Sequence, residues 1–121
     1  MDALYSRYAA FIRPGDNVVL ESGSSSFGIP PMTLADDVQV HIQMLWGSIG
    51  WATGATFGIA LADPNRRTIL ITGEGSHQLT ANEIGNMGRY GANPIIFVLN
   101  NDGYMVTPLP TSRKSNGKSI I

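Results

Sequence analysis

The feature that most constrains this chain is a pair of apolar runs, each ending in a polar loop that contains glycine. The first run, Thr68 to Thr72, is rich in β-branched residues and breaks into Gly73-Glu74-Gly75-Ser76. A helix-compatible segment follows from about His77 to Tyr90, and a second apolar run, Ile95 to Leu99, ends in Asn100-Asn101-Asp102-Gly103. This pattern predicts two parallel strands that bring both loops to one edge of a sheet, where ligands of open α/β sheets bind.

The residue types in these loops indicate the chemistry of that ligand. Glycines beside a helix N-terminus let backbone N–H groups approach a phosphate. Glu74 would repel a phosphate unless a cation lay between them, so its presence favours a bridging metal. The second loop adds oxygen donors from Asn100, Asn101 and Asp102, and oxygen ligands without cysteine suit Mg²⁺. The loops therefore predict a diphosphate carried on magnesium.

Other segments predict the remaining elements. Ala3 to Ile12 favours a short helix, and Asn17 to Glu21 favours a strand. Ser22 to Ser26 is interpreted from composition as a solvated turn, and Val38 to Met44 alternates as a half-buried strand does, which puts His41 on the polar, exposed face. Met44 to Ala62 is uncharged and nearly long enough for a membrane span, but its many small residues favour a helix packed closely against a sheet and a neighbour.

Composition excludes several classes of function. The chain has 121 residues, which is one domain or part of one, and a formal charge of −1 with 14% charged residues gives no basis for binding nucleic acid. It has no cysteine, which excludes disulfides, zinc thiolate sites and a cysteine nucleophile. The N-terminal residues lack the pattern of a secretory signal, so we expect a cytoplasmic protein that binds neither nucleic acid nor membrane.

Three motifs in this order resemble one known family. The sequence GEGS, followed after Leu99 by NNDGY, resembles the thiamine diphosphate motif, which usually reads GDGS and ends in NN. With ESGSSSFG at 21–28 and WGSIGW at 46–51, the chain resembles the pyruvate and indolepyruvate decarboxylase group over roughly residues 13–104. The resemblance implies an α/β fold, a three-layer doubly wound parallel sheet with helices on both faces, incomplete at its C-terminus.

The resemblance also assigns roles to individual residues. It implies that Ile49 is a wedge that pushes the two cofactor rings into a V, a positioned arrangement that favours intramolecular proton transfer. The other cofactor-binding residues that it implies are Ser24, Gly47, Ser48, Gly73, Gly75, Ser76, Asn101 and Gly103. For magnesium it implies Glu74, Asn101 and the backbone carbonyl of Gly103.

Two positions depart from the family pattern. Glu74 replaces the usual aspartate, which moves the carboxylate by about one bond length in a site with tight metal distances. The family's catalytic glutamate falls at position 107, where this chain has Thr107, and a threonine cannot relay protons near neutral pH. Residues 107–121 carry both lysines and no acid. We therefore expect a thiamine diphosphate-binding domain over residues 1–106 and a divergent, disordered tail over 107–121, from a truncation, a frame change or a gene fragment.

The function expected from this resemblance is non-oxidative decarboxylation of a 2-oxo acid, with pyruvate first and indolepyruvate or phenylpyruvate as alternatives. In the family, a pyrimidine-binding domain and a partner subunit complete the site, so we expect a homo-oligomer when complete and no activity from this chain alone. Two other readings stay open. One is a non-catalytic remnant or interaction module that keeps the fold, and the other is a dinucleotide-binding module, which Gln78 disfavours because GxGxxG requires glycine there.

Overall fold

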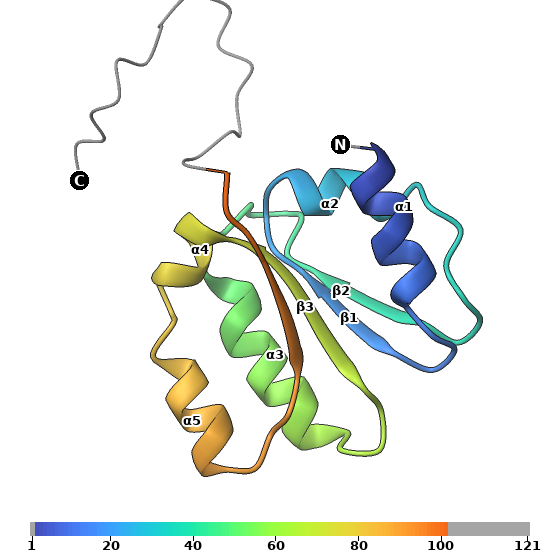
Figure 1. Cartoon of the computed structure of the whole chain (residues 1–121). Helices are drawn as coiled ribbons and strands as arrows, with labels where there is room; N and C mark the ends of the chain where they lie inside the picture. Colours follow the sequence, from blue (N-terminus) through green and yellow to red (C-terminus); the bar gives the residue numbers. More distant parts are fainter. Residues whose placement is uncertain (1, 102–121) are drawn as a thin grey trace, which may run out of the picture.

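The computed structural model describes residues 2–101 and shows one parallel sheet between two layers of helices (Figure 1). The sheet has four strands in the order β2-β1-β3-β4. The elements in chain order are α1 (Asp2–Phe11), β1 (Asn17–Leu20), α2 (Ser24–Gly28), β2 (Gln39–Ile42), α3 (Trp51–Ala62), β3 (Thr68–Gly73), α4 (Glu74–Gln78), α5 (Glu83–Arg89) and β4 (Ile95–Leu99).

All three strand pairs are parallel, as the sequence predicts. Val18 of β1 lies opposite Val40 of β2 on one side and Ile69 of β3 on the other. On the far side of β3, Gly73 lies opposite Leu99 of β4, so the two polar loops leave neighbouring strands at the same edge. From β1 the chain leads outward to β2, and from β3 it leads outward to β4 in the other direction. The carboxyl ends of β1 and β3 therefore flank the switch point where open α/β sheets bind ligands.

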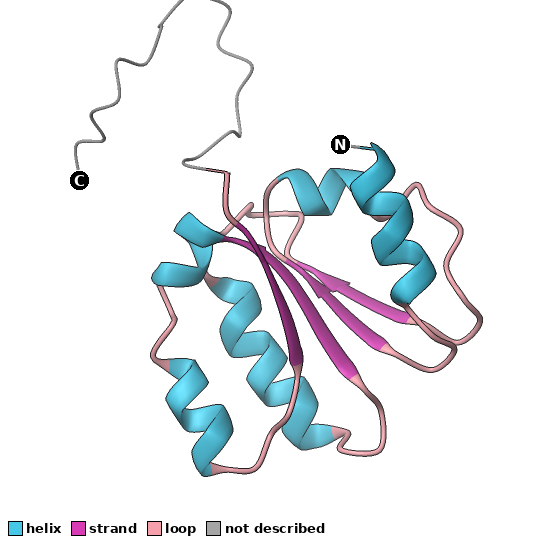
Figure 2. Cartoon of the chain, in the orientation of Figure 1, coloured by secondary structure: helices cyan, strands magenta, loops and turns pink. Residues whose placement is uncertain are grey.

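Each face of the sheet has its own apolar core, because successive strand residues point to opposite faces. On the face of α1, the core is formed by Tyr5, Ile12, Val18, Leu20, Ile29, Ile69 and Ile71. On the face of α3, it is formed by Val19, Ala52 and Leu70, with Ala55, Ile59 and Ile96 against them. Figure 2 shows helices on both sides of the strands, which confirms the three-layer α/β prediction.

Aromatic contacts fix the outer helices. The ring centroid of Phe97 on β4 lies 5.0 Å from that of Tyr8 and 5.3 Å from that of Phe11, both on α1. On the other face, the rings of Phe57 in α3 and Tyr90 just after α5 are 5.8 Å apart. Helix α1 thus contacts β4 on one face of the sheet, and α3 contacts the end of α5 on the other.

Three local predictions differ from the structure. The helix expected from His77 to Tyr90 is two helices, α4 and α5, and α4 already begins at Glu74. The segment expected as a solvated turn contains α2, in which Ser25 and Ser26 are buried. His41, expected on the exposed face, is half-buried because it lies beside Val19 on the α3 face, and its Nε2 atom is buried without a hydrogen-bond partner.

The membrane alternative for Met44 to Ala62 finds no support in the described structure. Helix α3 covers only the second part of that stretch and has 12 residues. Within residues 2–101, no helix has the length and apolar character that crossing a bilayer requires.

Candidate functional site

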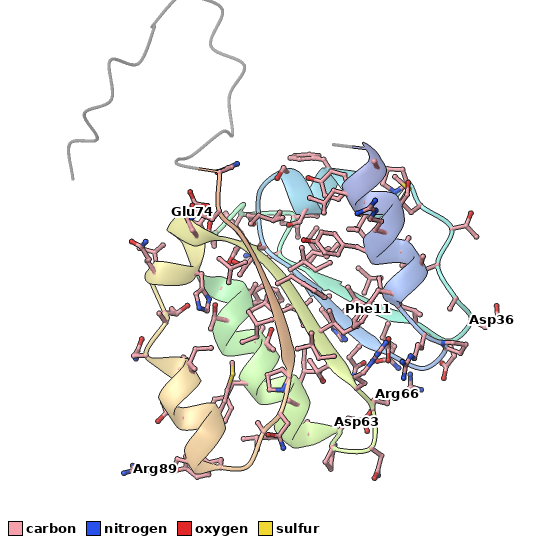
Figure 3. All side chains as sticks on the ribbon, in the orientation of Figure 1. Phe11, Asp36, Asp63, Arg66, Glu74 and Arg89 are labelled. Carbon is pink, nitrogen blue, oxygen red and sulfur yellow. The ribbon has the colours of Figure 1, made fainter. Side chains whose placement is uncertain are left out.

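The predicted site residues within 2–101 gather at the carboxyl edge of the sheet. Gly73 ends β3, and Glu74, Gly75 and Ser76 form the first turn of α4. Asn101 follows β4, the neighbouring strand. Figure 3 shows Glu74 at this edge, at the opposite end of the sheet from Arg66 and Asp63. Gly103 and Thr107 lie outside the described residues.

The loop that carries the predicted wedge lies beside α4. This loop, residues 46–50, follows β2 and leads into α3, and we call it the wedge loop. A Cβ atom added to Gly50 would lie 2.9 Å from Cβ of Leu79 and 3.5 Å from the carbonyl oxygen of Ser76. The hydroxyl of Thr80 donates a hydrogen bond of 2.8 Å to the Gly50 carbonyl. The fold therefore brings the wedge loop and the predicted diphosphate helix into direct contact.

Ser24 occupies the first position of α2, half-buried, at the carboxyl end of β1. Its neighbours Gly23 and Ser26, together with Gly47 and Ile49, are among the residues that line a cavity of about 160 Å³. That volume is below the roughly 300 Å³ of a typical small-molecule site. Ser24 itself is not among the lining residues, so the structure brings Gly47 and Ile49 together with the neighbours of Ser24.

The wedge loop exposes apolar side chains. Leu45 just before it is 92% exposed, Trp46 is 82% exposed and Ile49 is 40% exposed. Because neighbouring exposed apolar residues mark surfaces that a ligand or another polypeptide covers, this surface is not finished by residues 2–101 alone.

The residues at the β3 and β4 ends fit magnesium and a diphosphate. A Cβ atom added to Gly73 would meet nothing within 4 Å, so space is open in front of this loop. Residues 2–101 contain no group of three or more His, Cys, Asp or Glu side chains that could hold a metal. One carboxylate from Glu74 and one amide oxygen from Asn101 are the sparse set of protein oxygens that Mg²⁺ takes when phosphates and water complete its octahedron.

Sequence reasoning missed Glu21, which lies immediately after β1. It is 1% exposed, and its Oε1 and Oε2 atoms accept hydrogen bonds from the backbone N–H groups of Ser22 at 3.0 Å and Gly50 at 3.2 Å. Burial raises the pKa of the Glu21 carboxyl, and these hydrogen bonds oppose the rise. An acid directly after a fully buried strand is the signal that could have identified it.

His77 forms a second connection between the elements of the site. Its Nδ1 atom lies 3.1 Å from the hydroxyl oxygen of Thr53 in α3. The sequence predicts a surface or packing residue here, and this contact ties α4 to α3.

A larger hollow, of about 450 Å³, lies at the opposite edge of the sheet, where Arg66 and Arg67 contribute to its lining. Arg66 is paired with Asp37 at 2.8 Å and with Asp63 at 3.3 Å, and Arg67 is paired with Asp16. Because aspartates within the fold neutralise the Arg66 and Arg67 guanidinium groups, these two arginines do not make the hollow an anion site.

Comparison with known proteins identifies the family. Residues 21–120 match the family described as thiamine pyrophosphate enzyme, C-terminal TPP binding domain. This range extends past Thr107, into the segment for which the sequence predicts a divergent tail. The division at residue 106 stays a prediction, because residues 107–121 lie outside the described part of the chain.

Similar proteins come from several yeasts. Pyruvate decarboxylase isozyme 3 of Saccharomyces cerevisiae is 47% identical over 110 residues, which are 88% of this chain and 20% of that protein. Isozyme 1 of the same yeast is 46% identical over 121 residues, which cover 97% of this chain and 22% of that protein. The pyruvate decarboxylase of Kluyveromyces lactis is 46% identical over 110 residues, covering 88% and 20%. The chain thus spans about a fifth of the length of these relatives, and it belongs to the thiamine pyrophosphate enzyme family, within the C-terminal TPP-binding domain.

Proposed function

We propose that this chain is the thiamine diphosphate- and magnesium-binding part of a non-oxidative 2-oxo acid decarboxylase. The observation that carries the proposal is the meeting of three elements at one sheet edge: the wedge loop, the first turn of α4 and the segment after β4 that contains Asn101. The family match and the relatives named pyruvate decarboxylase support pyruvate as the substrate.

The residues of this chain would divide the cofactor between them. The backbone of Gly73 and Gly75 and the hydroxyl of Ser76 would hold the diphosphate. Glu74, Asn101 and the Gly103 carbonyl would hold magnesium. Ser24, Gly47, Ser48 and Ile49 would hold and shape the ring system. When bound, thiamine diphosphate supplies the electron sink for loss of CO₂, and the protein supplies binding and orientation.

The exposed surfaces support a homo-oligomer in the complete enzyme. Besides the apolar side chains at the wedge loop, the outer side of α3 is open: Leu61 is exposed, and a Cβ atom added to Gly54 or Gly58 would meet nothing within 4 Å. Small residues on an open helix face let another backbone approach closely. A cytoplasmic location and a small-molecule 2-oxo acid substrate belong to the same proposal.

Calorimetric titration of the 121-residue chain with thiamine diphosphate tests the proposal. We expect binding only when Mg²⁺ is present. Glu74→Ala should abolish it, whereas Glu74→Asp, the matched control, should keep it because it restores the usual carboxylate of the motif. Binding of NAD in place of thiamine diphosphate would reject the proposal.

A turnover assay with pyruvate separates binding from activity. Because Thr107 occupies the position of the family's catalytic glutamate and part of the site is exposed, we expect no acetaldehyde from this chain alone. Sustained decarboxylation by the purified chain would contradict its incompleteness. An intact fold that binds no cofactor would favour the second candidate, a non-catalytic remnant, which Thr107 motivates.

A further inference from the structure

Glu21 is a buried carboxylate that none of the roles assigned above uses. Glutamate is rarely buried without partners that satisfy its charge. Here each carboxylate oxygen accepts a hydrogen bond from a backbone N–H group. One donor is Ser22, and the other is Gly50, which lies 29 residues away in the chain. A side chain that joins the end of β1 to the start of α3 connects two separate parts of the carboxyl edge.

Gly50 is held on three sides. Its N–H group donates to Oε2 of Glu21 at 3.2 Å, and its carbonyl accepts from the hydroxyl of Thr80 at 2.8 Å. Its φ angle of +82° is unfavourable for residues with a side chain, and an added Cβ would lie 2.9 Å from Leu79. Other elements of the fold therefore fix the N–H group, the carbonyl group and the Cα atom of Gly50.

The other contacts of the wedge loop are weaker or local. The hydroxyl of Ser22 lies 3.3 Å from the carbonyl oxygens of both Gln43 and Ser48, so one donor is shared between two acceptors. The N–H of Trp46 donates to the side chain of Gln43, only three residues away and at an exposed position. Gly50 is therefore the firmest anchor of the loop, and it is bonded directly to Ile49.

We propose that Glu21 is a positioning residue whose carboxylate, together with the Thr80 hydroxyl, fixes Gly50 and so sets the place of the adjoining residue Ile49 in the wedge loop. The role of Ile49 as a cofactor wedge rests on the proposed function. The hydrogen bond between Glu21 and Gly50 is independent of that function. The carboxylate suits this task because one group can accept from two backbone donors on different elements, and charge-assisted hydrogen bonds are the stronger kind.

Amide hydrogen exchange of the full chain, followed by NMR without any ligand, tests the connection. Glu21→Gln keeps the size of the side chain, but its NH₂ group cannot accept, so one of the two backbone donors is left without its partner. In either orientation of the new amide, the Gly50 N–H loses its acceptor or the charge that strengthens its hydrogen bond, so its exchange should become about tenfold faster or more, while amides in β3 change little. Glu21→Asp keeps the charge with a shorter reach and should give a smaller acceleration.

Thr80 supplies an independent pair of variants in case Glu21 variants fail to fold. Thr80→Val removes the hydroxyl that holds the Gly50 carbonyl, and it should also speed Gly50 exchange, whereas Thr80→Ser should restore the slow rate. Ser25→Ala is the matched control, because it removes hydrogen bonds to the carbonyl oxygens of Glu21 and Ile71 without touching Gly50. Gly50 exchange in Thr80→Val or Glu21→Gln no faster than in Ser25→Ala would overturn the proposal.

A binding measurement then connects Glu21 to the cofactor. The only tryptophans in the chain are Trp46, the first residue of the wedge loop, and Trp51, the residue directly after it, so their fluorescence reports on the loop. Titration with thiamine diphosphate and Mg²⁺ should show affinity weakened about tenfold in Glu21→Gln and unchanged in Ser25→Ala. Equal affinity in Glu21→Gln and the parent chain would contradict a positioning role. If the parent chain does not bind, the proposed function fails, while the exchange rates still decide whether Glu21 fixes the loop.

Discussion

The ion pair between Asp16 and Arg67 gives the sharpest test of what holds the sheet together at its amino edge. Asp16 lies just before β1 and is 3% exposed, and Arg67 lies just before β3. Arg67 approaches both carboxylate oxygens, with Nε 3.0 Å from Oδ1, and the backbone N–H of Arg13 donates to Oδ2 at 2.7 Å. The pair thus joins the starts of the two central strands.

Removing Arg67 leaves a buried carboxylate with one backbone hydrogen bond. Breaking a buried pair in this way typically costs about 3–5 kcal/mol. The Arg67 side chain is 23% exposed, so water can partly replace it, and we expect the lower end of that range. Arg67 also donates to the Phe11 carbonyl at 3.0 Å and lies over the Phe11 ring at 4.8 Å, which adds about 0.5 kcal/mol. Arg67→Ala should therefore destabilise the chain by about 3 kcal/mol.

Urea unfolding followed by circular dichroism measures this change, and a melting temperature lower by about 12 °C or more should accompany it. Arg67→Lys keeps the charge but loses the two-pronged geometry, so it should cost only about 1 kcal/mol. Combining Arg67→Ala with Asp16→Asn should recover part of the loss, because the unpaired charge is gone. A cost below about 1 kcal/mol for Arg67→Ala would refute the reasoning, since that is the value of an exposed pair.

The same pair predicts a dependence on acid. Burial acts to raise the pKa of Asp16, but hydrogen bonds from Arg67 and from the Arg13 N–H outweigh it, so the pKa lies below its usual value. A lowered pKa in the folded state contributes stability above the pKa of the unfolded chain, and that stability is lost as pH falls through the folded-state pKa. Arg67→Ala should therefore show a smaller loss of stability between about pH 5 and about pH 2.

Four further substitutions test the core, a close backbone approach and a buried acid. Ile71→Ala, at a fully buried position of β3, should lower the free energy of unfolding in urea by about 3 kcal/mol. A loss under about 1 kcal/mol would show that the surrounding side chains fill the cavity. Gly28→Ala should lower the melting temperature, because its new Cβ would lie 2.4 Å from the Tyr5 ring. Gly54→Ala, whose new Cβ would meet nothing within 4 Å, should raise the free energy of unfolding by about 0.5–1 kcal/mol. Equal effects of the two substitutions would contradict the steric explanation. Because burial raises the pKa of Glu21, its stability contribution is present below the unfolded-chain pKa and lost as pH rises through the folded-state pKa. In Glu21→Gln, the free energy of unfolding should therefore fall less as pH rises through this range. An unchanged pH profile would show that another group causes the fall.

The strands could be predicted from sequence because each central strand is a short run of β-branched or aliphatic residues. Thr68 to Thr72 is buried along its whole length, and the predicted and observed strands differ by one residue at the end. Buried parallel strands are apolar on both faces, so the run itself carries the signal. The edge strand β2 was harder: Val40 is exposed and His41 is half-buried, because a strand at the sheet edge has a neighbour on only one side.

The break between α4 and α5 could not be predicted, because its cause lies elsewhere in the chain. Local periodicity favours one helix from His77 to Tyr90. In the structure the hydroxyl of Thr80 bonds to the carbonyl of Gly50, 30 residues earlier, and Leu79 packs against the same glycine. These tertiary contacts hold the chain between the two helices against the wedge loop, and tertiary context routinely overrides local propensity.

The wedge loop shows why binding without turnover is the expected behaviour of this chain. At its Gly50 end the backbone N–H donates to Glu21 and the carbonyl accepts from Thr80, so the position of Gly50, the residue bonded to Ile49, is set before any ligand arrives. At its other end Trp46, and Leu45 just before it, are largely exposed. In the proposed function, a phosphate group and a metal would be bound by the loops that follow β3 and β4, and the open end of the wedge loop takes no part in that binding. Decarboxylation needs water to be excluded and a proton to be relayed. The open side of the loop and the threonine at position 107 provide neither.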